Sequence, residues 1–340
     1  MRLAGVLAAA LALPLLLTSC GSDDEPTAAA PESSASADSV FPVTVTHKYG
    51  ETVVPEEPTR VVSVGVTEQD VLLQLGVVPV GVTEWYGEQP DATWPWAHDL
   101  LAGAHPEVLH TSDGLEFEKI AALEPDLIVG TNAGLSEKDY QLLSGIAPTV
   151  TSVEGSTEYF SPWPEQTLQI ARALGREADG QAIVDEVAAE YAAVAEAHPE
   201  WADLTATFSQ GGPYDGLLYV YPPGLSTDFL TDLGFTITTG FEEYAPKGSQ
   251  AEISAENVGL IDADVIVFAT ESAEMLQELQ DFGTVSSLSA VAENRAVYTD
   301  DILAGAIYFD TPLAHQYTLE RLVPMLEQAV AGEAPREYPS

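Results

Sequence analysis

The side chains best suited to chemistry in this sequence are aromatic rings gathered in two short segments, each of which follows a predicted strand. Four of the five tryptophans lie there. Flat rings with polar edges suit a large, partly apolar organic ligand that carries hydrogen-bonding groups. Ligands of open α/β sheets bind beyond the carboxyl ends of the strands, where these segments must lie. The predicted ligand-binding rings are Trp85, Tyr86, Trp94, Trp96, Tyr159, Phe160 and Trp163. Neighbouring prolines leave open the alternative that some of these rings only hold loops in place.

A second set of candidates follows predicted strands later in the chain and should form the opposite wall of the site. The predicted strand 206–209 is followed by Gln210 and Tyr214, and the predicted strand 265–269 by Thr270 and Glu271. Two further candidates are Asn132, after the strand 126–129, and Tyr308, in a predicted loop before the last helix. Tyr219 and Tyr221 alternate along a predicted strand and are interpreted as core or hairpin residues instead.

The histidines and the single cysteine argue against a metal centre. His98, His105 and His110 are close in sequence, but they are spaced by seven and five residues, and Pro106 between them favours a surface loop. One cysteine excludes an intramolecular disulfide and a thiolate metal cluster. We therefore predict no metal site.

Sequence signatures of catalysis are also missing. The chain has no G-x-x-x-x-G-K-[ST] loop, no G-x-G-x-x-G after a strand, no G-x-S-x-G and no H-E-x-x-H. A Ser–His–Asp hydrolase stays open as an alternative, because its members can be far apart in sequence, but we expect no enzyme.

The elements that must position these residues alternate between strands and helices. Segment 43–54 reads as a β-hairpin, and the chain then alternates predicted strands (61–65, 77–82, 126–129, 149–153) with predicted helices (70–75, 117–123, 136–146). Such alternation predicts an α/β fold with parallel sheets covered by helices.

An internal repeat indicates two lobes of related topology. Residues 70–76 match residues 228–234, with the apolar residues, Asp and Gly in register, and residues 120–129 match 258–267. Between the two halves, 166–197 has helical periodicity that Gly175 could interrupt. About 21 residues of helix span roughly 30 Å, enough to bridge two lobes. A second long helix, 312–330, contains Pro324, which should kink or split it.

The N-terminus indicates an exported, lipid-anchored protein. Arg2 precedes the apolar run 3–17, which is about 22 Å long as a helix and therefore too short for the roughly 30 Å hydrocarbon core. Leu17-Thr18-Ser19-Cys20 resembles a bacterial lipobox, so Cys20 is the predicted lipidation site. An ordinary signal peptide is the alternative. The predicted organisation is a signal peptide (1–20), a disordered tether (21–40), an N-terminal lobe (41–164), an inter-lobe helix (165–198) and a C-terminal lobe (199–335).

The charge is extreme, with 54 acidic against 11 basic residues and a net charge of −43. Such a surface repels phosphate backbones and excludes nucleic acid as a partner. Most of the acids fall on predicted exposed helix faces, which favours solubility and salt tolerance over attraction of a cationic ligand as their main role.

Taken together, three stretches resemble the siderophore-binding branch of the substrate-binding proteins of ABC importers, of actinobacterial type. They are 58–70, 79–87 and 120–129, supported by 303–309 and the final helix. The resemblance covers roughly residues 41–332. It implies two α/β lobes joined by one long rigid helix, with a ligand cleft between the lobes.

The resemblance also implies a function and partners. A lipid-anchored monomer on the outer face of the cell membrane would bind a ferric siderophore and deliver it to a permease and its ATPase. No resident cofactor is expected, because the iron arrives inside its chelate. Receptors for haem, cobalamin or free metal are alternatives within the class, and a surface adhesion or sensor lipoprotein is an alternative outside it.

Two finer expectations concern charge. In the family, one acid on each lobe docks onto permease arginines, and the repeat nominates Asp70 and Asp228, with Glu68 and Asp232 as the nearest alternatives. The candidate ligand-binding segments contain no Lys or Arg, so a trianionic catecholate would find no partner there. A neutral or cationic hydroxamate of the ferrioxamine type fits better, with Trp85 and Tyr86 as stacking partners and Glu271 facing a ligand amine. Arg60 or Arg295 could still reach the cleft from elsewhere in the sequence.

Overall fold

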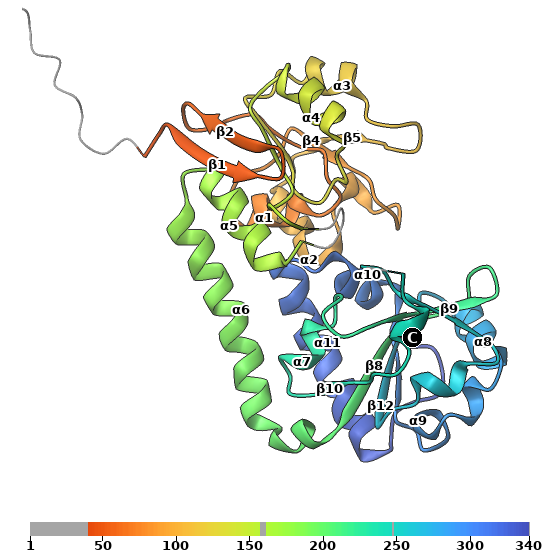
Figure 1. Cartoon of the computed structure of the whole chain (residues 1–340). Helices are drawn as coiled ribbons and strands as arrows, with labels where there is room; N and C mark the ends of the chain where they lie inside the picture. The colour runs from red at the N-terminus through yellow and green to blue at the C-terminus, as the bar shows by residue number, and fades with distance from the viewer. Residues whose placement is uncertain (1–39, 157–160, 247, 340) are drawn as a thin grey trace, which may run out of the picture. The chain divides into compact units, whose positions relative to one another are not determined.

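The computed structural model describes residues 40–156, 161–246 and 248–339. The signal peptide, the lipobox with Cys20 and nearly all of the tether lie outside these ranges, as do Tyr159 and Phe160. Residues from Val40 onward form one compact unit, in which two α/β lobes can be distinguished (Figure 1). Within the described ranges, no helix combines the length and the apolar character needed to cross a membrane.

The N-lobe is a parallel sheet with helices on both faces, preceded by a hairpin. The hairpin pairs β1 (Val43–His47) with β2 (Gly50–Val54), as predicted. The sheet has the order β5-β4-β3-β6-β7, and its strands are β3 (Val61–Ser63), β4 (Gly81–Thr83), β5 (Glu107–Leu109), β6 (Leu127–Gly130) and β7 (Thr149–Thr151). Its helices are α1 (Glu68–Gln74), α2 (Pro95–His98), α3 (Phe117–Ala122), α4 (Glu137–Ser144) and α5 (Trp163–Ala173).

The C-lobe has a related sheet with an antiparallel addition. Its strand order is β11-β9-β8-β12-β13, and the short β10 also pairs with β8. The strands are β8 (Thr205–Gln210), β9 (Leu217–Tyr221), β10 (Thr236–Ile237), β11 (Ala251–Ser254), β12 (Val265–Ala269) and β13 (Ala296–Tyr298). The helices are α7 (Asp228–Thr231), α8 (Ala273–Asp281), α9 (Ser289–Ala292), α10 (Asp301–Phe309) and α11 (Pro312–Ala331). Strand β9 is the reversed member, because it pairs antiparallel with both β8 and β11.

The internal repeat has a structural counterpart in each lobe. Asp126, just before β6, accepts hydrogen bonds from the backbone N–H and hydroxyl of Thr59, each 2.8 Å long. Asp264, just before β12, accepts the same pair of bonds from Thr205, at 2.8 and 2.7 Å. In both lobes this aspartate therefore ties the start of one central strand to its neighbour.

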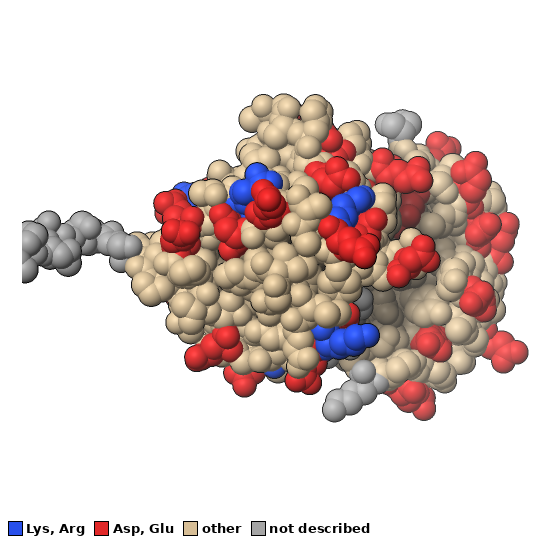
Figure 2. Space-filling model, turned by 90° about the horizontal axis from the view of Figure 1, so that it is seen from above, with Lys and Arg blue, Asp and Glu red and all other residues tan. Residues whose placement is uncertain are grey.

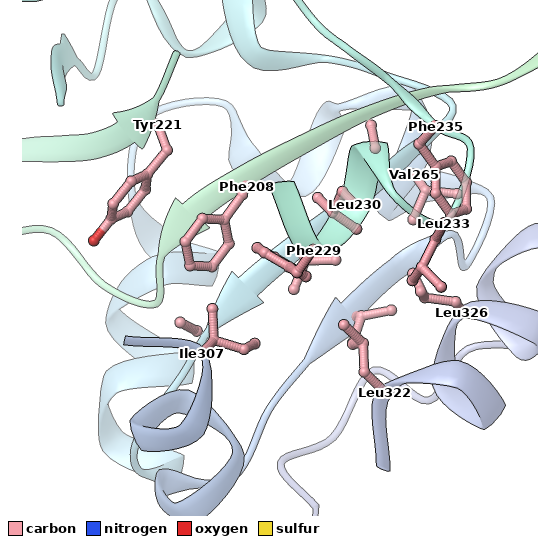
Figure 3. Close-up of a cluster of buried hydrophobic side chains, with 14 of the residues drawn as sticks. Phe208, Tyr221, Phe229, Leu230, Leu233, Phe235, Val265, Ile307, Leu322 and Leu326 are labelled. Carbon is pink, nitrogen blue, oxygen red and sulfur yellow. The ribbon is translucent and has the colours of Figure 1, made fainter. Parts of the chain in front are cut away.

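The core of each lobe lies on both faces of its sheet, because successive side chains of a strand point to opposite faces. In β12, Val265 and Val267 pack into one apolar cluster, and Ile266 and Phe268 into the cluster behind the sheet. Figure 3 shows the first cluster, in which Phe208 lies beside Tyr221, whose hydroxyl points away from the apolar side chains. All five residues of β12 are buried, as expected of a central strand covered on both sides.

One long helix, α6 (Glu177–Ala197), runs from the N-lobe to the C-lobe, as predicted, and α11 packs beside it. The predicted segment 165–198 is divided at Gly175, where φ is +67°: α5 packs into the N-lobe core, and α6 (Glu177–Ala197) continues to the C-lobe. Helix α11 lies beside α6 (Figure 1), and the Tyr191 hydroxyl is 2.8 Å from His315 Nδ1. Pro324 lies inside α11, which continues through it, so of the predicted kink or split the split is wrong.

Direct contact between the lobes adds two small apolar clusters. In one, Trp94 and Trp96 of the N-lobe pack against Phe309 and Ala314 of the C-lobe. In the other, Leu313 at the start of α11 packs against Leu73 and its neighbours in the N-lobe. The lobes are thus held together by side-chain packing as well as by chain connections.

Candidate ligand-binding cleft

A cavity of about 570 Å³ lies between the two lobes. The N-lobe and the start of α5 line one side with Val66, Trp85, Tyr86, Thr111, Asn132, Ser161, Pro162, Trp163 and Gln166. The C-lobe lines the other side with Gln210, Tyr221, Gly224, Ser226, Asp228, Gln250, Glu271, Ile307, Tyr308, Phe309 and Asp310. This volume is within the range of sites that enclose a small organic molecule.

Seven of the predicted ligand-binding residues line this cavity. They are Trp85, Tyr86, Asn132, Trp163, Gln210, Glu271 and Tyr308. Trp85 is 43% exposed, and its ring centroid lies 4.8 Å from Tyr86 and 5.4 Å from Phe309. Tyr308 belongs to α10 rather than to the loop predicted for it. Its ring centroid is 6.4 Å from that of Tyr86 across the two lobes.

Four predicted residues do not line the cavity. Trp94 is 3% exposed and packs with Trp96 in the inter-lobe cluster, so these rings hold the loop instead of facing the cleft. Tyr214 is 67% exposed and lies before a turn between β8 and β9. Thr270 is fully buried, and its hydroxyl donates to the Thr299 carbonyl, which ties the end of β12 to the segment after β13. Tyr159 and Phe160 lie outside the described residues.

Sequence reasoning missed several lining residues. Tyr221 belongs to the core, as interpreted from the sequence, and it also lines the cavity, which the sequence did not indicate. Gln250 precedes β11 and gave no signal in the sequence. Asp310 lies at the junction of α10 and α11, where it ends α10 with φ +52°, and it lines the cavity. Thr311-Pro312, an N-cap followed by proline, could have located that junction.

The docking assignment of Asp70 is wrong. Asp70 is fully buried, and its Oδ2 accepts hydrogen bonds from Trp96 Nε1 at 2.7 Å and from the Thr311 hydroxyl at 2.6 Å. Its nearest alternative, Glu68, is 1% exposed. Neither carboxylate can reach a partner protein. Asp228 is exposed but lines the cavity, contrary to the expectation that it lies outside the cleft, and Asp232 is exposed.

Glu68 instead supports the loop that carries Asn132. Its Oε1 accepts from the Asn132 backbone N–H at 2.7 Å and from the Thr131 hydroxyl at 3.2 Å. Burial raises the pKa of Glu68, and these hydrogen bonds oppose the rise. Asn132 Nδ2 donates to Thr67 Oγ1, which leaves Asn132 Oδ1 buried and without a hydrogen-bond partner among the described residues.

Two more buried polar atoms of the lining residues lack such partners within the described ranges, namely the Tyr86 and Ser161 hydroxyls. Buried polar groups are normally paired, so three unpaired ones around one cavity are groups that a bound ligand could satisfy. Asn132 Oδ1 can only accept a hydrogen bond, which favours a ligand with N–H or O–H donors.

The described lining residues include three carboxylates and no Lys, Arg or His. Burial, and then the charge of Asp301, raise the pKa of Glu271. Partial burial, and then the charge of Asp310, raise the pKa of Asp228. Asp310 Oδ1 lies 3.0 Å from His315 Nε2. The cavity therefore has two acidic regions, one at Glu271 and one at Asp228 and Asp310.

The remaining basic and histidine candidates lie elsewhere. Arg60 donates to the carbonyls of Leu123 and Glu124, and Arg295 pairs with Glu293 at 3.4 Å, so neither lines the cavity. His105 Nδ1 is 3.1 Å from Asp91, and His98 Nε2 is 3.6 Å from it. In the part of the chain that the structure describes, no three His, Cys, Asp or Glu side chains are grouped so as to hold a metal ion.

Comparison with known proteins identifies the family to which this architecture belongs. Residues 61–303 match the periplasmic binding protein family. The chain belongs to this family. A periplasmic solute binding protein from Mycobacterium smegmatis has a similar crystal structure, with 40% identity and a TM-score of 0.79 over 85% of this chain and 98% of that one.

Two further similar proteins bear names that mention siderophores or iron. The probable siderophore-binding lipoprotein YfiY of Bacillus subtilis is 26% identical over 304 residues, 85% of this chain and 88% of the relative. PiaA of Streptococcus pneumoniae, an iron uptake ABC transporter substrate-binding protein solved with ferrichrome, is 26% identical with a TM-score of 0.71. That match covers 85% of this chain and 99% of PiaA. A shorter match, 26% identical over 34% of this chain and 43% of the relative, is with the vitamin B12-binding protein of Salmonella typhimurium.

Proposed function

We propose that the protein binds a ferric siderophore outside the cytoplasmic membrane and delivers it to an ABC importer. Its family supports this, as do the siderophore-binding name of YfiY and the ferrichrome complex of PiaA. The named relatives are solute-binding proteins, which fits a receptor rather than an enzyme. Iron would enter as part of the ligand, with no resident cofactor.

We further propose that the siderophore is a hydroxamate of the ferrioxamine type. The observation that carries this is the charge of the cavity: carboxylates at Asp228, Glu271 and Asp310 and no base among the described lining residues. A ferric tris-catecholate has three negative charges, and bringing it beside these carboxylates, with no base in the described lining, would leave those charges desolvated and uncompensated. A ferric tris-hydroxamate is neutral, or cationic when it carries a free amine.

The aromatic lining fits the same ligand class. The methylene chains between hydroxamate groups are apolar and can pack on Trp85, Tyr86 and Trp163, and amide N–H groups can donate to Asn132 Oδ1. An ammonium at the end of such a ligand would find a carboxylate at Glu271 or at Asp228. Charge-assisted hydrogen bonds of this kind are about twice as strong as neutral ones.

The lipid anchor belongs to the same proposal. Acylation of Cys20 would hold the protein at the outer face of the membrane, with residues 21–40 as a flexible tether. Two acyl chains are needed for stable anchoring, because one chain gives only marginal, reversible membrane binding.

Ligand titration of the purified protein tests the ligand class. Intrinsic tryptophan fluorescence and calorimetry would be recorded with ferrioxamine B, its N-acetylated form without the ammonium, ferric enterobactin, haemin and cyanocobalamin. We expect ferrioxamine B to bind most tightly and Glu271→Gln or Asp228→Asn to weaken it about three- to tenfold. The same variants should leave the acetylated ligand within about twofold, because it offers no cation.

Other outcomes discriminate among ligand classes. Tighter binding of ferric enterobactin refutes the charge argument, and Lys247, which lies outside the described residues, would then be tested by Lys247→Ala. Tightest binding of cyanocobalamin would favour the vitamin B12 branch, which one relative represents, and would exclude the siderophore proposal.

A further inference from the structure

Asp70 joins the two lobes through one buried oxygen atom. Its Oδ2 accepts both from Trp96 Nε1 of the N-lobe and from the Thr311 hydroxyl of the C-lobe. Thr311 is also the N-cap of α11, since its Oγ1 accepts from the Ala314 backbone N–H at 3.3 Å. The single hydroxyl proton of Thr311 is therefore committed to Asp70, and the start of α11 is fixed relative to α1.

A continuous series of ring contacts leads from this carboxylate to the cleft. Trp96 stacks on Trp94 with centroids 5.1 Å apart and an interplanar angle of 16°. Trp94 contacts Tyr86 at 5.2 Å and Phe309 at 5.6 Å. Tyr86 and Phe309 both line the cavity, and both contact Trp85. A shift of Trp96 would therefore displace the rings on which a ligand packs.

This inter-lobe contact leaves no spare room. A methyl group added at Gly305 of α10 would lie 2.4 Å from Trp94 Cζ3, and one at Gly87 would lie 2.7 Å from Trp94 Cζ2. Real methyl groups do not approach so closely, so the Trp94 ring is held between two glycines, one from each lobe. The small residue at 305 is required by this close approach and not by a turn, because α10 continues through it.

We propose that Asp70 is a positioning residue for ligand binding: together with Thr311 and Trp96 it clamps the lobes and sets the aromatic wall of the cleft. The choice of ligand in this inference rests on the proposed function, whereas the contact of Asp70 with Trp96 and Thr311 does not depend on it. Asp70 itself touches no ligand, because it is fully buried and does not line the cavity.

Five substitutions separate the clamp from general stability. Thr311→Val removes the C-lobe donor at nearly constant volume, and Trp96→Phe keeps an aromatic ring but removes the N–H. Asp70→Ala removes the acceptor, whereas Asp70→Asn retains an oxygen that can accept both bonds. Gly305→Ala forces Trp94 away from α10. The matched control is Gly259→Ala, whose added methyl group meets no atom within 4 Å.

Affinity for ferrioxamine B is measured at a temperature where each variant is folded. We expect a loss of about tenfold or more in each of Thr311→Val, Asp70→Ala and Gly305→Ala. In the first two this is the effect of losing hydrogen bonds to a charged group. In Gly305→Ala it follows from displacement of the Trp94 ring by the added methyl group. Asp70→Asn should stay within about threefold of wild type, and Gly259→Ala should match it. Wild-type affinity in both Thr311→Val and Gly305→Ala overturns the proposal.

A ligand-independent measurement distinguishes failure of the clamp from failure of the proposed function. Hydrogen exchange of α1 and the α10–α11 junction should be faster in Thr311→Val and Asp70→Ala than in wild type or Asp70→Asn. If ferrioxamine B binds none of the proteins but exchange follows this order, the ligand assignment fails and the clamp stands. If exchange is unchanged in both variants, the clamp fails whatever the ligand is.

Discussion

Replacing Asp70 by asparagine should remove a pH-dependent cost to stability. Burial raises the pKa of Asp70 to about 6, although the hydrogen bonds from Thr311 and Trp96 oppose the rise. The folded protein therefore holds a proton on Asp70 more tightly than the unfolded chain does, where the value is 3.8. Stability from this group is fully present below the unfolded value and is lost as pH rises through about 6.

The size of the effect follows from the shift. About two pKa units at 1.36 kcal/mol each give a cost of roughly 3 kcal/mol at neutral pH, of which roughly 2 kcal/mol develops between pH 4 and pH 7. The amide introduced by Asp70→Asn has no charge to desolvate, so this component should be absent from the variant. Burial also raises the pKa of Glu68, Asp228 and Glu271, and these shifts contribute in the same direction. Only the difference between wild type and variant isolates Asp70.

Urea unfolding of both proteins at pH 4, 5, 6 and 7 measures this difference directly. The unfolding free energy of Asp70→Asn minus that of wild type should become more positive by roughly 2 kcal/mol from pH 4 to pH 7. The control, Asp228→Asn, alters an exposed carboxylate and should change the curve less. A pH-independent difference would show that Asp70 has the same pKa in the folded protein as in the unfolded chain, and it would refute this reasoning.

Two further predictions concern the anchor and the core. Cys20→Ala should release the protein from the membrane fraction or leave an unprocessed precursor, as judged by fractionation and intact mass; unchanged retention with normal cleavage would contradict lipidation. Phe208→Ala should lower the unfolding free energy by about 3–5 kcal/mol, because Phe208 is fully buried between Tyr221 and Phe229. Phe208→Ala should also weaken ligand binding, because the Tyr221 ring that lines the cleft would lose its stacking partner. If denaturant titration gave the variant the same unfolding free energy as wild type, Phe208 would be excluded from the core.

The α/β architecture could be predicted because local patterns and global fold agree. The short, β-branched apolar run Val265–Ala269 predicts a strand covered on both faces, and all five residues are buried in the structure. Asp126 and Asp264 recur in the repeat, and each makes the same pair of bonds to a threonine at the start of the neighbouring strand. The scattering of acids over the face seen in Figure 2, without one dominant patch, agrees with the interpretation that most of the charge is solvated.

The aromatic wall could be predicted only as a group. Trp85 and Trp94 lie in the same predicted segment, yet one ring lines the cleft and the other is 3% exposed. Which ring turns inward depends on Phe309 and Gly305, far along the chain, and no local pattern records that contact. Tyr221 could be placed in the core, but its position at the cavity wall could not be predicted for the same reason, because that wall is completed by the N-lobe.

Asp70 and Asp228 show why an internal repeat predicts a fold but not the surroundings of its residues. Both aspartates lie in the first turn of equivalent helices, α1 and α7, where the helix dipole favours an acid. The N-terminal end of α11 then covers α1, which buries Asp70 against Thr311, whereas Asp228 stays exposed at the edge of the cleft. Helix α11 packs against α1 and covers Asp70. Asp228, at the start of α7, is not covered in this way. A charge reversal at Asp70 would therefore place a cation in a fully buried site, and a transport defect in that variant would report unfolding or loss of the clamp rather than lost docking to a permease.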